Sequence, residues 1–163
     1  MISKTKKKIP PTTEIRVWNR QRRIRINSGA AEIFCGALAE FLNLYGSPFS
    51  VVFTGAAAMR KLNREWRKKD YATDVLSFSY DGEFIDGLPF LGEIVVAPEI
   101  AARRAAEYGA TPEREIRKLI VHGALHLMGY DHETDGGEMI RMQNMLVRKR
   151  FFKEGPDLVI KDR

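Results

Sequence analysis

Residues 112–132, PEREIRKLIVHGALHLMGYDH, hold all three histidines of a 163-residue chain within their last eleven positions. Thr111 precedes the stretch as a helix N-cap, and Pro112 occupies the first helical position. Gly129 suits a helix C-terminus, where a left-handed residue reverses the chain at little cost. The stretch therefore predicts a helix that ends at a glycine turn, with the last histidine on the returning segment.

The spacing of the three histidines is that of a metal site. His122 and His126 lie four residues apart, so a helix stacks them on one face, where both reach one ion. His132 follows the turn glycine and approaches from another side. A lone histidine on an apolar helix is usually a core residue, whereas three around a turn glycine favour ligation. We expect one divalent metal per chain, with zinc first and nickel or copper as alternatives, and a coordination position left for water.

The pattern His-x-x-x-His-x-x-Gly-x-x-His is that of the metzincin metalloproteases. Those enzymes place a glutamate directly after the first histidine, as the general base that activates water. This chain has Gly123 there. Peptide hydrolysis by that mechanism therefore lacks its base.

The rest of the chain alternates strand and helix patterns around this motif. Ser28 is the expected N-cap of the first helix and Gly46 its end, while Asp135 and Glu138 have capping-box spacing at the start of the last helix. We expect a small mixed sheet of about four strands covered by about five helices, an α+β fold with an α/β-like three-layer arrangement. The expected strands are residues 14–19, 49–55, 73–80 and 91–98, the expected helices 28–46, 56–69, 99–109, 111–129 and 135–152, and residues 81–89 an intervening loop.

Positive charge is concentrated near the N-terminus. Residues 1–30 carry nine Lys and Arg and one acid, against a formal net charge of +6 for the whole chain. We expect residues 1–13 to form a basic arm and residues 14–163 a single catalytic domain. A basic arm attracts polyanions such as RNA, although a solvated tail would look the same in sequence.

Cysteine usage and hydropathy indicate the compartment. The single cysteine, Cys35, cannot form an internal disulfide and is expected to be a buried core residue in a reducing environment. The apolar runs are too short to span a membrane, and the N-terminus lacks the pattern of a secretory signal. We expect a cytoplasmic protein without membrane association.

Three blocks together resemble the YbeY-type endoribonucleases, the rRNA maturation factors. The blocks are HGALHLMGYDH, LNREWRKKDYATDVLSF and LGEIVVAPE, and the resemblance is collinear from about residue 50 to residue 145. It implies a small sheet surrounded by helices, a metal held by three histidines, and metal-dependent cleavage of single-stranded RNA. It further implies a role in ribosomal RNA maturation, especially at the small-subunit RNA 3′ end, and in ribosome quality control. The implied partners are ribosomal RNA and proteins of the ribosomal subunit.

The resemblance also singles out one arginine. The functionally important arginine of the family falls on Arg67, whose planar fork is suited to phosphate oxygens. Without the resemblance, Arg67 would be one solvated residue among several at a helix end. Lys68 and Lys69 are expected to add RNA contacts. Ala72 and Ser79 stand where prolines are common in the family.

Four further residues are candidates for supporting roles. Thr73 and Asp74 would fix the loop that follows Arg67 or orient a ligand, although a cap at the start of a strand is an equal alternative. Asp131 would accept an imidazole N–H or serve as a turn residue. Gly129 is expected to have a positive φ, because the chain must reverse within a few residues.

Two other classes of function remain open from the residues alone. One is a metal-stabilised ribosome assembly factor that cleaves nothing. The other is a metal-dependent hydrolase of a different substrate, such as a peptide or a small phosphoester. The missing glutamate disfavours the peptide, and the basic arm favours a polyanion.

Overall fold

The computed structural model describes residues 15–44, 46, 49–80, 82–85 and 88–161. The expected basic arm of residues 1–13 lies outside the described residues. The elements follow the expected order, with a short hairpin and a divided last helix in addition. In chain order they are β1 (Arg16–Asn19), α1 (Ser28–Phe41), β2 (Phe49–Phe53), α2 (Ala56–Arg67), β3 (Val75–Ser79), β4 (Phe84–Ile85), β5 (Leu88–Pro89), β6 (Gly92–Val96), α3 (Pro98–Glu107), α4 (Pro112–Leu127), α5 (Glu138–Leu146) and α6 (Arg150–Lys153).

The main sheet has four strands in the order β1-β2-β6-β3. The strands β1, β2 and β6 are parallel, and β3 pairs antiparallel with β6 at the edge of the sheet. Val51 of β2 lies opposite Ile94 of β6, and both are fully buried. The expected mixed sheet of four strands is confirmed.

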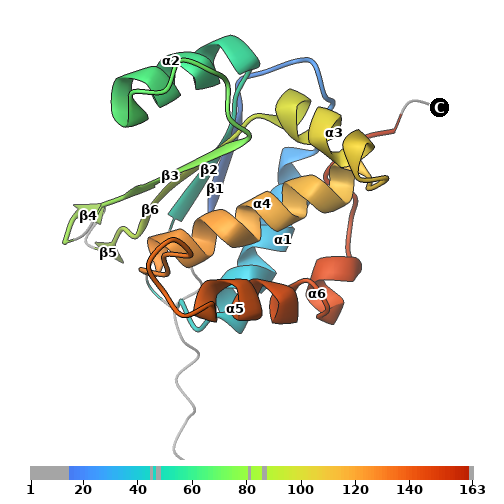
Figure 1. Ribbon diagram of the computed structural model, residues 1–163. Coiled ribbons are helices and arrows are strands. Elements are labelled where there is room, and N and C mark those ends of the chain that lie inside the picture. The colour runs from blue at the N-terminus through green and yellow to red at the C-terminus, as the bar shows by residue number, and fades with distance from the viewer. Residues whose placement is uncertain (1–14, 45, 47–48, 81, 86–87, 162–163) are drawn as a thin grey trace, which may run out of the picture.

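Helices cover both faces of this sheet (Figure 1). On one face α1 and α4 pack on the strands and build the larger core, with α5 and α6 outside them. On the other face α2 covers a smaller cluster that includes Val52, Met59 and Val95. The expected three-layer arrangement is confirmed, and β3 is left as the edge strand beside α4. Within the described residues, none of the helices has the length and hydropathy needed to cross a bilayer.

The first helix begins and ends differently from the prediction. Its N-cap is Asn27, whose side chain accepts a hydrogen bond from the backbone N–H of Ala30 at 3.1 Å, so the assignment of Ser28 was wrong. The backbone N–H of Asn27 donates to the carbonyl of Leu158, which fixes this residue outside the helix. The helix ends at Phe41, before the expected Gly46.

The C-terminal region also departs from the prediction. The expected helix of residues 135–152 is two helices, α5 and α6, and Asp135 caps α5 from outside by accepting from Gly137 and Met139. The buried guanidinium of Arg117 donates to the carbonyls of Phe152, Glu154 and Pro156, and so holds this part of the chain in a bend. The expected loop of residues 81–89 contains the short hairpin β4–β5.

Candidate metal centre

Helix α4 carries the first two histidines and is fixed to the sheet at the same point. The side chain of Thr111 accepts from the N–H of Arg114, and Pro112 is the first helical residue, as predicted. Gly123 lies against Ile94 of β6, where an added Cβ would come within 2.6 Å of Cγ2. The hydroxyl of Ser77 on β3 donates to the carbonyl of Gly123 at 3.3 Å. The helix is therefore held close to the sheet directly beside His122.

A glycine turn brings the third histidine back. Gly129 has φ +92°, so the predicted positive φ is confirmed. Its N–H donates to the carbonyl of His126, which closes the helix end. The ring of His132 lies 5.4 Å from that of His122 and 5.3 Å from that of His126, measured between centroids. One ring nitrogen from each histidine lies within 4.8 Å of the others.

Hydrogen bonds fix the nitrogens that face the cluster. Nδ1 of His126 lies 2.9 Å from the carbonyl oxygen of Tyr130, which only accepts, so Nδ1 carries the proton. Nδ1 of His122 lies 2.9 Å from Oε1 of Gln143 and is a donor in the same way. Both Nε2 atoms then present lone pairs to each other across 3.1 Å. Two lone pairs at this distance repel unless a cation lies between them.

The donor set fits a metal such as zinc. Imidazole nitrogens at tetrahedral angles around zinc lie about 3.3 Å apart, given Zn–N bonds of about 2.0–2.1 Å. The pair on α4 is already near this separation, and the exposed His132 is free to adjust. The described residues therefore bring together three histidines that can hold one metal ion.

Burial favours the neutral form of the two helix histidines. Desolvation lowers the pKa of His122 below its ordinary value, and the hydrogen bond to Gln143 only partly opposes this. Desolvation also lowers the pKa of His126, with smaller contributions in the same direction from the charges of His132 and Arg67. Neutral imidazole is the form that binds a metal.

The histidines line a groove of about 460 Å³ that follows the edge strand β3. Arg67, the last residue of α2, lines the same groove from the other side of that strand. The exposed Arg60 and Arg64 on the same helix pair with Asp70. Arg67 has no ion pair within the part of the chain that the structure describes. The groove thus joins the three-histidine cluster to an arginine whose charge is available to a ligand.

Comparisons with known proteins agree with this geometry. The family model described as endoribonuclease YbeY matches residues 16–150. The chain belongs to the YbeY endoribonuclease family. An endoribonuclease YbeY from Thermodesulfovibrio yellowstonii is 34% identical over 145 residues, which cover 80% of this chain and 91% of that protein. One from Solibacter usitatus is 48% identical over 98 residues, which cover 60% of this chain.

The similarity to individual YbeY proteins is strongest in part of their length. The aligned segments span 63% of the Solibacter usitatus protein and 64% of the one from Aquifex aeolicus. The fold is also similar to a solution structure from Thermotoga maritima, with a TM-score of 0.58 and 30% sequence identity. That alignment covers 82% of this chain and 86% of the other. Sequence and fold thus place the chain in the YbeY family.

The candidate supporting residues have definite surroundings. Thr73 and Asp74 are buried beside the groove, and the Thr73 hydroxyl lies 3.3 Å from the Asp74 carboxylate. Arg104 of α3 pairs with Asp74, whose charge also acts on His122. The carboxylate of Asp131 accepts from the N–H of Glu133 and the hydroxyl of Thr134, which is the turn role rather than the imidazole contact.

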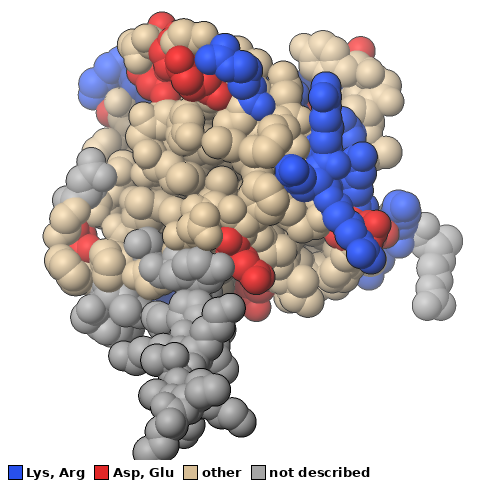
Figure 2. All heavy atoms as spheres, turned by 90° about the horizontal axis from the view of Figure 1, so that it is seen from below, with Lys and Arg blue, Asp and Glu red and all other residues tan. Residues whose placement is uncertain are grey.

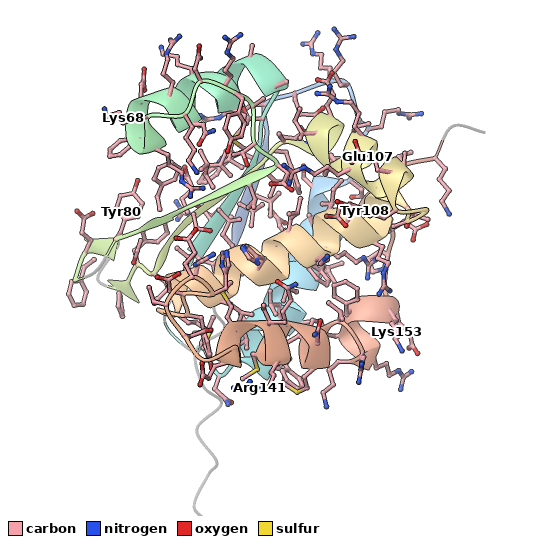
Figure 3. All side chains as sticks on the ribbon, in the orientation of Figure 1. Lys68, Tyr80, Glu107, Tyr108, Arg141 and Lys153 are labelled. Atoms are coloured by element: carbon pink, nitrogen blue, oxygen red, sulfur yellow. The ribbon has the colours of Figure 1, made fainter. Side chains whose placement is uncertain are left out.

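The two lysines after Arg67 are exposed, and Lys68 lies at the end of α2 (Figure 3). Lys68 has φ +57° and closes the helix, and its ammonium group donates to the carbonyl of Glu65. Neither Lys68 nor Lys69 lines the groove beside the histidines. Their position suits contacts with a ligand that extends beyond the groove.

The sequence did not identify the residues that orient the histidines. Gln143 lies on α5, and only the packing of α5 beside α4 brings its amide to His122. The Tyr130 carbonyl is a backbone group, so the residue type at this position does not indicate the contact with His126. The capping pattern at Asp135 predicted a helix near Gln143, but nothing in the sequence indicated which of its faces would meet α4.

Proposed function

We propose that this protein is a metal-dependent endoribonuclease that cleaves single-stranded RNA in the maturation of ribosomal RNA. The observation that carries this proposal is the meeting of three convergent histidines and an exposed arginine in one groove of a YbeY-family fold. The proposal includes the small-subunit RNA 3′ end as the processed region and ribosome quality control as the context. Ribosomal subunit proteins are the proposed partners, and the cytoplasm is the proposed compartment.

The metal would be held by His122, His126 and His132. Zinc fits three neutral imidazoles with room for water, and nickel or copper are the alternatives. When bound, such an ion supplies a Lewis acid and a water of lowered pKa at neutral pH. Gln143 and the Tyr130 carbonyl orient the two helix histidines, so their Nε2 lone pairs are directed into the cluster before a metal arrives.

Arg67 would bind the phosphate under attack. Cleavage of a phosphodiester builds negative charge on the oxygens bound to phosphorus, and a guanidinium stays charged and contacts two of them at once. Arg67 shares the groove with the histidines, and its charge acts on His126. Its proposed catalytic role is therefore to stabilise charge in the transition state from the side opposite α4.

Surface charge supports a polyanionic substrate. Lys and Arg side chains gather on the side of the molecule that carries α6 (Figure 2). Exposed cations in and just before α6 include Arg148, Arg150 and Lys153. Together with the basic N-terminal sequence, these charges would attract RNA phosphates and steer the strand toward the protein. Lys68 and Lys69 would extend the contacts beyond the groove.

The proposal is tested with metal-loaded protein and a labelled single-stranded RNA oligonucleotide. We expect cleavage, its loss on chelation, and its recovery when zinc is returned. A His126→Ala variant purified in parallel serves as the control for contaminating nuclease, because a contaminant would survive the substitution. RNA binding without cleavage under every metal condition would favour the assembly-factor alternative.

A further inference from the structure

A second groove, of about 380 Å³, adjoins the metal groove on the α3 side of α4. The two share the lining residues Asp74, Val75 and His122, so they adjoin at the His122 ring. The Nε2 side of that ring faces the metal cluster, and the Nδ1 side meets Gln143, which lines the second groove. A strand lying in the metal groove would reach this space with its next nucleotide.

The charges of the second groove are balanced. Arg104 and Asp74 pair with each other, and Lys118 is accompanied by Glu115. Excess positive charge favours phosphate binding, and the lining of the second groove has none, with two basic and two acidic residues. The second groove instead offers polar groups of both kinds, which suits the donors and acceptors on the edge of a neutral base.

Tyr108 supplies an aromatic surface for such a base. It follows α3 and lies between α3 and α4 (Figure 3). Tyr108 is 78% exposed, and its ring stacks on no other aromatic ring among the described residues. By contrast, Tyr80 packs against Phe90, with centroids 5.5 Å apart. An exposed aromatic ring at the rim of a polar groove is the usual platform for an unpaired base.

Gln143 adds a donor to the same space. Its Oε1 is engaged with Nδ1 of His122, so its NH₂ group remains for a ligand. The Gln143 amide would thus contact a base with its NH₂ group and the His122 ring with its oxygen. Gln143 would therefore both orient the proposed metal ligand His122 and bind the neighbouring nucleotide.

We propose that this second groove is a nucleobase subsite, in which Tyr108 stacks on a base of single-stranded RNA adjacent to the phosphate at the histidine cluster. The subsite rests on the proposed nuclease function and deepens it. It accounts for a preference for single strands, since a paired base cannot turn into the groove. The phosphates would bind beside Arg67 and the metal, while one base would enter the second groove between α3 and α4.

The test combines a protein change with an RNA change. A set of single-stranded RNA oligonucleotides carries one abasic nucleotide, moved stepwise along both sides of the cleavage site. With the wild-type protein, one abasic position should raise KM about 5- to 150-fold, the range that corresponds to loss of one base–aromatic stack. Tyr108→Ala should raise KM for the intact RNA by the same factor, with kcat little changed, and should be insensitive to that abasic position. Tyr108→Phe should behave like wild type.

Control variants distinguish base stacking on Tyr108 from phosphate binding in the same groove. Phe84→Ala removes an exposed aromatic ring on β4 that lines neither groove, and should leave KM unchanged. If wild-type protein cleaves RNA but Tyr108→Ala keeps the same KM, the subsite is refuted and the nuclease function stands. If Lys118→Ala weakens binding and flattens its salt dependence while Tyr108→Ala does not, the groove binds phosphate and the proposal is wrong. If wild-type protein cleaves none of these RNAs, both proposals fall.

Discussion

Replacing Arg67 by alanine separates the proposed role of its charge from the proposed role of the metal. Arg67 is exposed, ends α2, and makes no ion pair among the described residues, so its loss removes little that holds the fold. The free energy of unfolding should change by no more than about 0.5 kcal/mol. Metal content should stay normal, because the substitution changes none of the three histidines. The positive charge of Arg67 opposes the binding of a cation near His126, so its loss does not weaken metal binding.

RNA cleavage by Arg67→Ala should nevertheless fall about 100-fold or more, or about 2.7 kcal/mol of transition-state free energy. The assay is single-turnover cleavage of a single-stranded RNA, with metal content measured on the same preparation. Arg67→Lys should recover little, because a point charge cannot contact two phosphate oxygens in the manner of a guanidinium. Arg64→Ala is the matched control, since Arg64 is an exposed arginine on the same helix that pairs with Asp70.

His126→Ala should differ from Arg67→Ala in its metal content. It leaves two histidines that hold a metal poorly, so metal content and cleavage should fall together. Normal cleavage by Arg67→Ala would refute the role of the arginine. A loss of metal in Arg67→Ala as large as that in His126→Ala would show that the arginine acts through the cluster rather than on the RNA.

Three further outcomes are expected. Burial lowers the pKa of His122 and His126 below the ordinary 6.5, so these histidines take up protons at a higher pH in the unfolded chain than in the folded protein. The stability of metal-free protein, measured by thermal unfolding, should therefore decrease as the pH falls below about 6.5. Metal affinity should weaken in the same pH range. Gly129→Val should lower metal affinity in a zinc titration, because a β-branched residue resists φ +92°. The space around an added Cβ is open, so the effect comes from the backbone conformation, and unchanged affinity would contradict this. Deleting residues 1–12, which removes four lysines, should weaken RNA binding and reduce its salt dependence without changing the maximal cleavage rate.

Local patterns in the sequence predicted the metal cluster because its geometry is local. One helix, one glycine and one short turn bring the three histidines together, and helix spacing is enough to see this. The main strands and most helices follow from periodicity for the same reason. Arg67 is different: it lines the same groove as the histidines from the far side of the edge strand β3, and the family resemblance alone singled it out.

The features that the sequence missed depend on contacts between distant segments. Asn27 rather than Ser28 caps α1 because the carbonyl of Leu158 holds its backbone from the other end of the chain. The chain is held at and after α6 by Arg117 of α4, which binds the carbonyls of residues 152, 154 and 156. Gln143 meets His122 only after α5 has packed beside α4. Tertiary hydrogen bonds of this kind leave no periodic signal.

The residue after His122 limits the hydrolytic chemistry that this fold can carry. A Cβ on residue 123 would lie 2.6 Å from Cγ2 of Ile94 in the centre of the sheet and 3.1 Å from the hydroxyl oxygen of Ser77. The glutamate that metzincins use at this place would force α4 away from β6. Glycine is thus required by packing, and the missing base is a consequence of the fold. In the proposed cleavage of RNA, the proton acceptor would therefore come from the groove facing α4, from solvent or from the RNA itself.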